Sequence, residues 1–183
     1  MKISAYIIAY NEVDKISDCI KSVLWADEII VADSNSTDGT SEIAESLGAS
    51  VVQIEFNGYG SLRNEAISFC NGEWIFSLDS DERCTEKVRD EILLLIKNAP
   101  LDIYKVPRKN FFMGKWIKYG GYYPIWILRL FKHRLASCDR DMNEHIIVKG
   151  KVGRLKNDFV DNNKKGISDW IEKHNKYASF EAS

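Results

Sequence analysis

Apolar segments that resemble buried strands alternate with helix-like segments through the first half of this chain. The predicted strands are residues 3–9, 28–33, 51–54 and 74–78. Apolar side chains recur at helical spacing between them, which predicts helices over residues 13–25, 41–47 and 60–70. Nearly continuous apolar strands are typical of a parallel sheet that is covered on both faces. The alternation therefore predicts an α/β fold, with helices on both faces of a mostly parallel central sheet.

The second half of the chain has a different pattern. An amphipathic helix is predicted over residues 88–96, and short strand candidates follow at residues 103–106, 125–131 and 145–148. Glycine-containing turns separate these candidates, which indicates a smaller α+β half that lies against the sheet. Residues 167–180 carry apolar side chains at helical spacing and predict a second amphipathic helix. Its apolar face either packs on the domain or meets a membrane or a partner.

Composition limits the possible ligands and the setting. The chain has 183 residues, of which 45% are hydrophobic, so we expect a single domain over residues 1–183, with halves at 1–99 and 100–183. A net charge of −2 gives no global basic field for nucleic acid. The four cysteines lack CxxC spacing, which favours a reducing, cytoplasmic setting. The N-terminal apolar run is too short for a signal peptide, and no window approaches the ~20 apolar residues of a membrane span.

Three carboxylates, Asp79, Asp81 and Glu82, directly follow the apolar residues 74–78. Crowded carboxylates repel each other unless a cation lies among them. Ligands of α/β sheets bind at the carboxyl ends of the strands, so this cluster suits a divalent metal and the phosphate that the metal carries. The alternative is that Asp81 or Glu82 complements the dipole of a helix that begins near residues 84–85. The cluster alone leaves both interpretations open.

Polar clusters also follow the first two predicted strands, at residues 11–12 and 33–40. A single sheet would bring them to the same edge as the acidic cluster. A nucleotide needs acceptors for its base N–H and its ribose hydroxyls, which carboxylates supply, and its diphosphate needs a cation. The three clusters together therefore predict a metal-assisted nucleotide or sugar-phosphate enzyme.

Four segments of the first half carry a family signature. They are IAYNE at residues 8–12, IIVADSNSTDGT at 29–40, RNEA at 63–66 and WIFSLDSDE at 74–82. In their order and spacing over residues 3–97, they resemble the family 2 glycosyltransferases, which have the Rossmann-like GT-A fold of nucleotide-diphospho-sugar transferases.

The second half extends this resemblance. It contains FMG at residues 112–114, GGYYP at 120–124, RLF at 129–131, NEH at 143–145 and WIEKHNKY at 170–177. These segments are similar to the bacterial lipopolysaccharide core β-1,4-glucosyltransferase group within the family.

The resemblance implies a set of residues that bind the nucleotide sugar. Tyr10 and Glu12 would line the nucleoside pocket, and Asp33 would accept a hydrogen bond from the uracil ring N–H. Arg63 would lie near the base or the diphosphate. Asp79 would bind the ribose.

The resemblance also implies a metal and a base. Asp81 would coordinate Mg²⁺ or Mn²⁺ that bridges the diphosphate and stabilises the charge on the departing nucleoside diphosphate. An inverting transferase needs a base that deprotonates the acceptor hydroxyl as it attacks the anomeric carbon. Glu144 matches the family's base, with Asp139 and Asp141 as alternatives. Arg129 is placed to bind a diphosphate or an acceptor phosphate, because a guanidinium binds phosphate in bidentate fashion.

Two positions depart from the group's pattern. Asn143 stands where the group has a His before the base. A second His is expected downstream of residue 155, where this chain offers Asp158 and Asp161. Asp161 could replace that His as an oxygen ligand of the metal. Between these sites, residues 115–123 are rich in aromatics and cations, and they form either a mobile acceptor loop or a hairpin that closes the core.

The function implied by the resemblance is an inverting, metal-dependent hexosyltransferase. The donor would be a UDP-sugar, with glucose as the first choice, and the acceptor a lipopolysaccharide-core or lipid-linked glycan. The expected location is the cytoplasm, with peripheral contact to the inner face of the plasma membrane. Two alternatives are a catalytically weak sugar-nucleotide-binding module and a nucleotidyltransferase. The latter typically has a Gly-rich, Lys/Arg-bearing loop after its first strand, which residues 10–12 lack.

Overall fold

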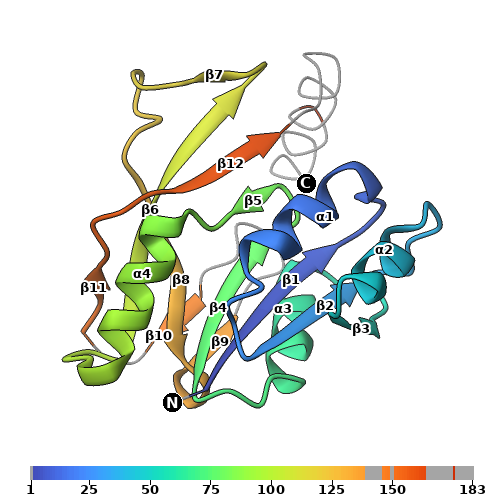
Figure 1. The fold of residues 1–183 in the computed structure, drawn as a ribbon, viewed down its shortest axis with the longest axis horizontal. Helices are drawn as coiled ribbons and strands as arrows, with labels where there is room; N and C mark the ends of the chain where they lie inside the picture. The colour runs from blue at the N-terminus through green and yellow to red at the C-terminus, as the bar shows by residue number, and fades with distance from the viewer. Residues whose placement is uncertain (1, 139–145, 149–150, 164–174, 176–183) are drawn as a thin grey trace.

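Four parallel strands form one side of the sheet in the computed structural model, which describes residues 2–138, 146–148, 151–163 and 175. Their order is β3–β2–β1–β4, as Figure 1 shows. The strands are β1 (Ile3–Ala9), β2 (Glu28–Asp33), β3 (Ser50–Gln53) and β4 (Trp74–Asp79). Each lies within one residue of its predicted bounds, so these four strand predictions are confirmed.

Helices cover both faces of these strands, as the sequence predicts. The helices are α1 (Val13–Ser22), α2 (Thr40–Ser46), α3 (Tyr59–Ser68) and α4 (Glu86–Leu95). Buried side chains of α1, α2 and α4, such as Ile16, Ala44 and Ile92, join one hydrophobic core. Leu62 and Ala66 of α3 join a second core on the other face.

The central strand β1 shows why the apolar runs are continuous. Ile3, Ala5 and Ile7 contribute to the core under α1, α2 and α4. Tyr6 and Ile8 contribute to the core under α3. Successive side chains of a strand point to opposite faces, so a strand covered on both faces is apolar at nearly every position. The polar exception in β1 is the buried Ser4, whose hydroxyl donates to the Glu28 carboxylate. Full burial of one such Ile stabilises the fold by about 1.5–3 kcal/mol.

The second half extends the same sheet, and its strand β6 (Ile103–Phe112) is longer than the sequence predicts, whereas β9 (Ala136–Cys138) and β10 (Ile146–Val148) pair in a separate two-stranded sheet. β8 (Ile125–Lys132) pairs antiparallel with β4, and β6 pairs antiparallel with β8. β6 continues past residue 106 because its second half pairs with β12 (Phe159–Asn163). The other short elements are β5 (Glu82–Arg83), β7 (Lys115–Trp116), β11 (Gly153–Arg154), and 3-10 turns at Ile96–Asn98 and His133–Leu135.

Some predicted features lie beyond the described part of the chain. Residues 139, 141, 143 and 144, which include the predicted base, fall outside it, and so does the predicted helix at 167–180 except for residue 175. In the part that the structure describes, no helix has the length and hydropathy that a transmembrane segment requires.

Candidate active site

The polar loops after β1, β2 and β4 begin at one edge of the sheet. Ala9, at the end of β1, pairs with Asp33 at the end of β2. Ile8 pairs with Asp79 at the end of β4. The prediction that one sheet brings these three clusters together is therefore confirmed. This edge is the candidate active site, because α/β sheets bind ligands outside the carboxyl ends of their strands.

Hydrogen bonds join the first two of these loops. The Asn11 N–H donates to Ser36 Oγ (2.8 Å), and Asn11 Oδ1 accepts from the Thr37 N–H (2.9 Å). The Glu12 N–H donates to Thr40 Oγ1 (2.9 Å). Asn11 has a φ of +51°, in the left-handed region that Asn tolerates better than most residues. This conformation leaves Tyr10 61% exposed at the sheet edge, where its ring is accessible to a flat ligand.

Asp33 organises the second loop from within. Its side chain is fully buried, and its carboxylate accepts hydrogen bonds from the Ser36 N–H (3.0 Å), the Ser36 hydroxyl and the Ser41 hydroxyl (2.8 Å). A carboxylate has about four acceptor sites, so one remains for a further donor. Asp33 therefore holds the loop that faces the site, and a uracil N–H would have to reach the remaining acceptor site.

A network of arginines and carboxylates lies under the acidic cluster. Arg63 Nη2 on α3 donates to Asp79 Oδ1 (2.6 Å). Arg129 Nη2 on β8 donates to Asp79 Oδ2 (2.8 Å) and to Glu82 Oε1 (2.6 Å). The Asp79 N–H donates to Glu82 Oε2 (3.0 Å). Both arginines and Glu82 are buried, so this network fixes Asp79 at the end of its strand.

The position of Glu82 contradicts one of the two interpretations of the acidic cluster. The helix begins at Glu86, and its N-cap is Thr85, whose hydroxyl accepts from the Val88 N–H. Glu82 instead lies in β5 with 0% exposure and contacts Arg129 and Arg108. The interpretation of Glu82 as a helix-start carboxylate is therefore wrong. Two arginines from the second half of the chain bind this carboxylate, and local sequence does not reveal them.

Arg129 also differs from its expected position. The sequence predicts that this guanidinium binds phosphate, but the side chain is 4% exposed and its Nη2 contacts two carboxylates. Burial lowers the pKa of Arg129, but Asp79 and Glu82 raise it above its usual range, so the guanidinium stays charged. This geometry indicates that Arg129 positions Asp79 and Glu82, and it argues against direct binding of phosphate by Arg129.

The last described strand returns to the acidic cluster. β12 pairs antiparallel with β5, which places Asp161 opposite Glu82, and the Asn162 N–H donates to the Asp81 carbonyl (3.0 Å). Asp161 Oδ2 lies 3.4 Å from Arg108 Nη1, which is itself 3.3 Å from Glu82 Oε1. The structure thus brings Asp161 beside the cluster. The sequence does not single out Arg108, because it lies in the polar stretch PRKN at residues 107–110, beyond the predicted strand at 103–106.

Asp158, the other substitute for the missing His, has a different environment. Its carboxylate accepts from the Tyr123 hydroxyl (2.8 Å) and pairs with Lys109 (2.9 Å). Tyr123 also packs edge-on against Trp116, with ring centroids 5.2 Å apart. Within residues 115–123, Trp116 and Tyr123 therefore close the hairpin against the domain, whereas Tyr119 and Tyr122 are exposed.

Asp81 is the carboxylate of the cluster that remains available for a metal. Its side chain makes no hydrogen bond or ion pair with the residues that the structure describes. No group of three His, Cys, Asp or Glu side chains in that part of the chain is arranged to hold a metal. Mg²⁺ in nucleotide enzymes is held by one or two carboxylates together with substrate phosphates. Asp81, with Asp161 close by, fits such an ion because the diphosphate would supply the other oxygens.

The buried network shifts the pKa values of its carboxyls in opposite directions. Burial alone would raise the pKa of Asp79, but Arg129 and Arg63 hold it well below its usual range. Burial raises the pKa of Glu82 to about 7, and Asp79 adds to this shift while Arg129 and Arg108 oppose it. Asp79 is therefore the ionised member of the pair at neutral pH, and Glu82 titrates near neutrality.

These shifts predict two separate windows of pH-dependent stability. Asp79 contributes stability above its ordinary pKa of 3.8, and this contribution is lost as the pH falls. Glu82 has the opposite sign, because its contribution is present below 4.5 and is lost as the pH rises through about 7. We expect Asp79→Asn to flatten the acid limb of a stability curve, and Glu82→Gln to flatten the limb between pH 4.5 and 7. Urea unfolding across this pH range measures both slopes, and slopes equal to wild type in either variant contradict the assignment.

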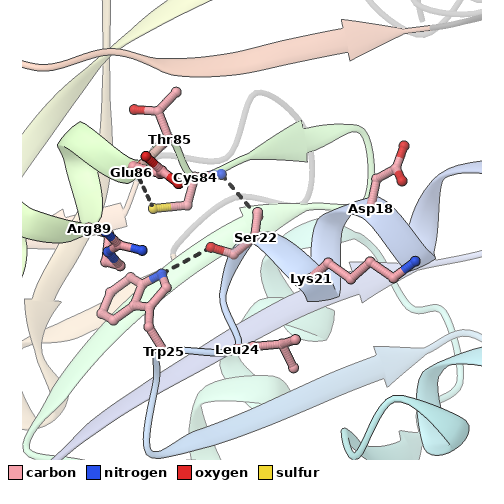
Figure 2. Close-up of a pocket in the computed structure, with 9 residues that line it drawn as sticks. All are labelled: Asp18, Lys21, Ser22, Leu24, Trp25, Cys84, Thr85, Glu86 and Arg89. Carbon is pink, nitrogen blue, oxygen red and sulfur yellow. Dashed lines mark hydrogen bonds between the residues drawn. The ribbon is translucent and has the colours of Figure 1, made fainter.

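The pocket in Figure 2 lies away from this sheet edge. It has a volume of about 420 Å³ and lies between the last turn of α1 and the first turn of α4. Its lining residues are Asp18, Lys21, Ser22, Leu24, Trp25, Cys84, Thr85, Glu86 and Arg89. Ser22 joins its two sides, since its carbonyl accepts from the Trp25 indole N–H (3.0 Å) and its hydroxyl accepts from the Cys84 N–H (3.0 Å). None of the predicted site residues lines this pocket.

The order of the strands and the polar loops at the sheet edge are those of the GT-A fold. The chain belongs to glycosyl transferase family 2, whose sequence model matches residues 4–159. Its fold matches that of Staphylococcus aureus TarS 1–349 in complex with UDP-GlcNAc, with a TM-score of 0.68 at 19% identity. That match covers 91% of this chain and 60% of TarS 1–349. The predicted family and the predicted GT-A fold are therefore confirmed.

The length over which this chain matches a relative differs from one relative to the next. The chain is 29% identical over 196 residues to the lipopolysaccharide core biosynthesis glycosyltransferase LpsC of Rhizobium meliloti, covering 100% of this chain and 71% of LpsC. It is 44% identical over 104 residues to an uncharacterized glycosyltransferase of Rickettsia bellii, covering 56% of this chain. The matched part spans only 35% of the length of that Rickettsia relative.

A second solved structure is also similar. The glucosyl-3-phosphoglycerate synthase of Mycobacterium tuberculosis, in complex with Mn²⁺, UDP-glucose and phosphoglyceric acid, is 26% identical with a TM-score of 0.51. That match covers 59% of this chain and 44% of the synthase.

Proposed function

We propose that this chain transfers a hexose, with glucose as the first choice, from a UDP-sugar to a lipopolysaccharide-core or lipid-linked glycan, with inversion at the anomeric carbon. The observation that carries the proposal is the convergence of the loops after β1, β2 and β4 around Asp79 and Asp81. The similarity to LpsC supports the acceptor class, and the synthase bound to Mn²⁺ and UDP-glucose supports the donor and the metal. The reaction would take place on the cytoplasmic face of the plasma membrane.

The nucleoside would bind along the loops of β1 and β2. Tyr10 offers an exposed ring for the base. Glu12, whose carboxylate pairs with Lys15, and the buried Asp33 would supply the acceptors for the base. Asp79 uses one oxygen for Arg63 and the other for Arg129, which leaves about two acceptor sites for ribose hydroxyls. The arginine pair fixes Asp79 in its ionised form, so its acceptor sites are oriented before the donor binds.

The diphosphate would lie over Asp81, where Mg²⁺ or Mn²⁺ fits together with Asp161. A bound divalent ion supplies Lewis-acid stabilisation of the charge that develops on the leaving diphosphate. The chain's own residues orient the donor so that the anomeric carbon faces the second half. We propose that residues 1–99 and 100–183 act as one domain, in which the first half binds the donor and the second half binds the acceptor.

Glu144 is the proposed base for the acceptor hydroxyl. We expect Glu144→Gln to lower the transfer rate about 10²–10⁴-fold, because general-base assistance contributes that factor. UDP binding should be unchanged, since the base contacts the acceptor and not the nucleotide. Asp139→Asn and Asp141→Asn are the matched controls, and both should transfer sugar normally. A normal rate in Glu144→Gln with a slow rate in either control moves the base to that aspartate.

A panel of UDP-sugars with Mg²⁺ or Mn²⁺ tests the proposed reaction. Transfer of glucose to a lipopolysaccharide-core acceptor is the expected result. Metal-dependent UDP-sugar binding without transfer or hydrolysis would instead identify a binding module. Pyrophosphate release from a nucleoside triphosphate and a sugar phosphate would identify a nucleotidyltransferase.

A further inference from the structure

The sequence contains an acid-free segment that the proposed donor site does not explain. Residues 103–138 include eight Lys or Arg residues and nine aromatic residues but no Asp or Glu, in a chain whose net charge is −2. Part of this charge is neutralised by acidic residues elsewhere, since Lys109 pairs with Asp158 and Lys132 with Asp102. Lys115 and Lys118 form no ion pair with the described residues. Two positive charges without an ion pair to the described residues therefore lie at or next to β7.

β6 and β7 form a hairpin that projects away from the helices, at the top of Figure 1. Phe112 pairs with Lys115, so the turn consists of Met113 and Gly114 alone. Their φ angles are +50° and +74°, both in the left-handed region of a type I′ turn. Asn-Gly is the favoured sequence for this turn, and a large apolar residue at its first position is strained. The chain therefore places Met113 at an exposed tip despite an unfavourable backbone conformation.

The side chains around this tip are amphipathic. Met113 is 65% exposed and Tyr119 is 84% exposed. The Lys118 and Lys109 ammonium groups lie 4.6 and 4.8 Å from the Trp116 ring, so the indole is half-buried beneath cations. Trp and Tyr rings flanked by lysines are typical of segments that lie at a membrane–water interface. No acidic side chain in residues 103–138 opposes an anionic surface.

We propose that this hairpin tip, formed by Met113, Lys115, Lys118, Tyr119 and Tyr122, binds the surface of an anionic lipid bilayer. Met113 would enter the boundary between headgroups and acyl chains, and the aromatic rings would lie at headgroup level. Lys115 and Lys118 would contact the lipid phosphates. A lipid-linked acceptor would be presented at such a surface, and in this respect the inference rests on the proposed function.

Vesicle flotation tests this surface. The whole chain should float with vesicles of phosphatidylglycerol and phosphatidylcholine in equal parts, should remain unbound with phosphatidylcholine alone, and should be released by added salt. The double variant Lys115→Ser/Lys118→Ser should bind the anionic vesicles at least about tenfold more weakly. Binding of wild type to neither vesicle, or equal binding of wild type and this double variant, overturns the proposal.

Met113→Asn separates membrane binding from folding. Asn-Gly fits the type I′ turn, so this variant should unfold at the same or a higher urea concentration than wild type. It should nevertheless bind anionic vesicles about tenfold more weakly, because an apolar side chain has been replaced by a polar one. Leu94→Asn is the matched control, since Leu94 is 73% exposed on α4, and its vesicle binding should equal that of wild type. Vesicle binding of Met113→Asn that equals that of wild type also overturns the proposal.

UDP-sugar hydrolysis distinguishes this proposal from the proposed function. Met113→Asn should hydrolyse the donor in solution at the wild-type rate, because Met113 lies outside the donor loops. A wild-type chain that binds vesicles but never uses a UDP-sugar refutes the proposed function and leaves the membrane surface intact. A Met113→Asn variant that binds vesicles normally but loses hydrolysis assigns the tip to the active site instead.

Discussion

Replacing Arg129 with Met is expected to lower the free energy of unfolding by about 3–5 kcal/mol, the cost of leaving buried charges without their partner. Arg129 is buried and its Nη2 contacts Asp79 Oδ2 at 2.8 Å and Glu82 Oε1 at 2.6 Å. Without it, Arg108 at 3.3 Å is the only described arginine that contacts the Glu82 carboxylate. Met matches the length of the arginine stem, so the lost free energy of unfolding reflects the missing charge and hydrogen bonds more than a change in packing volume.

Lys132→Met is the matched control on the same strand. Lys132 pairs with Asp102 at 2.8 Å, but both side chains are partly exposed, so its removal should cost no more than about 1 kcal/mol. Urea unfolding of both variants measures the difference. Adding Glu82→Gln to Arg129→Met should recover part of the lost stability, because it removes one of the uncompensated charges. Equal unfolding midpoints for Arg129→Met and Lys132→Met contradict a central role for this network.

Asp81→Asn is expected to lower metal-dependent sugar transfer by about two to four orders of magnitude, the kinetic equivalent of several kcal/mol of charge stabilisation. Its folding stability should stay within about 0.5 kcal/mol of wild type, since the Asp81 side chain makes no hydrogen bond or ion pair with the described residues. This combination distinguishes Asp81 from Asp79 and Glu82, whose replacement affects the buried network. Calorimetric titration of UDP with and without Mn²⁺ measures the binding part of the effect.

The control for Asp81 is Asp90→Asn. Asp90 lies on α4, exposed and paired with its neighbour Arg89, away from the carboxyl ends of the parallel strands. Its replacement should change neither transfer nor UDP binding. If Asp81→Asn keeps the full dependence of UDP binding on Mn²⁺, Asp81 is not a metal ligand and the central feature of the proposed site fails.

The sheet edge could be predicted because its determinants are local. The parallel strands are mostly apolar runs, and the polar residues that follow them mark where each strand ends. The helix after the acidic cluster could be predicted near Thr85 for the same reason, since a Thr precedes an amphipathic pattern. The family signature lies within these segments, so the family and the fold could be inferred from the sequence together.

The environment of the acidic cluster could not be predicted because its partners are remote in the sequence. Glu82 resembles a helix-start carboxylate until β12 pairs with β5 and Arg129 and Arg108 reach it from β8 and β6. β5 has only two residues, too few to produce an alternating pattern. Arg129 was expected at a phosphate because the charge of a guanidinium can be read from the sequence, whereas its burial beside two carboxylates cannot.

The pairing of β12 with β5 makes assembly of the site a late event in folding. Asn162 donates to the carbonyl of Asp81, and Asp161 lies opposite Glu82, so the last described strand holds the acidic loop from its outer side. The chain between β5 and β12 must be closed into a long loop, and this closure costs conformational entropy before the contacts between the two strands form. During synthesis the parallel strands β1 to β4 emerge from the ribosome long before β12. A nascent chain can therefore build its parallel sheet early, but the loop that carries Asp81 gains its final support only when nearly all of the described chain has been made.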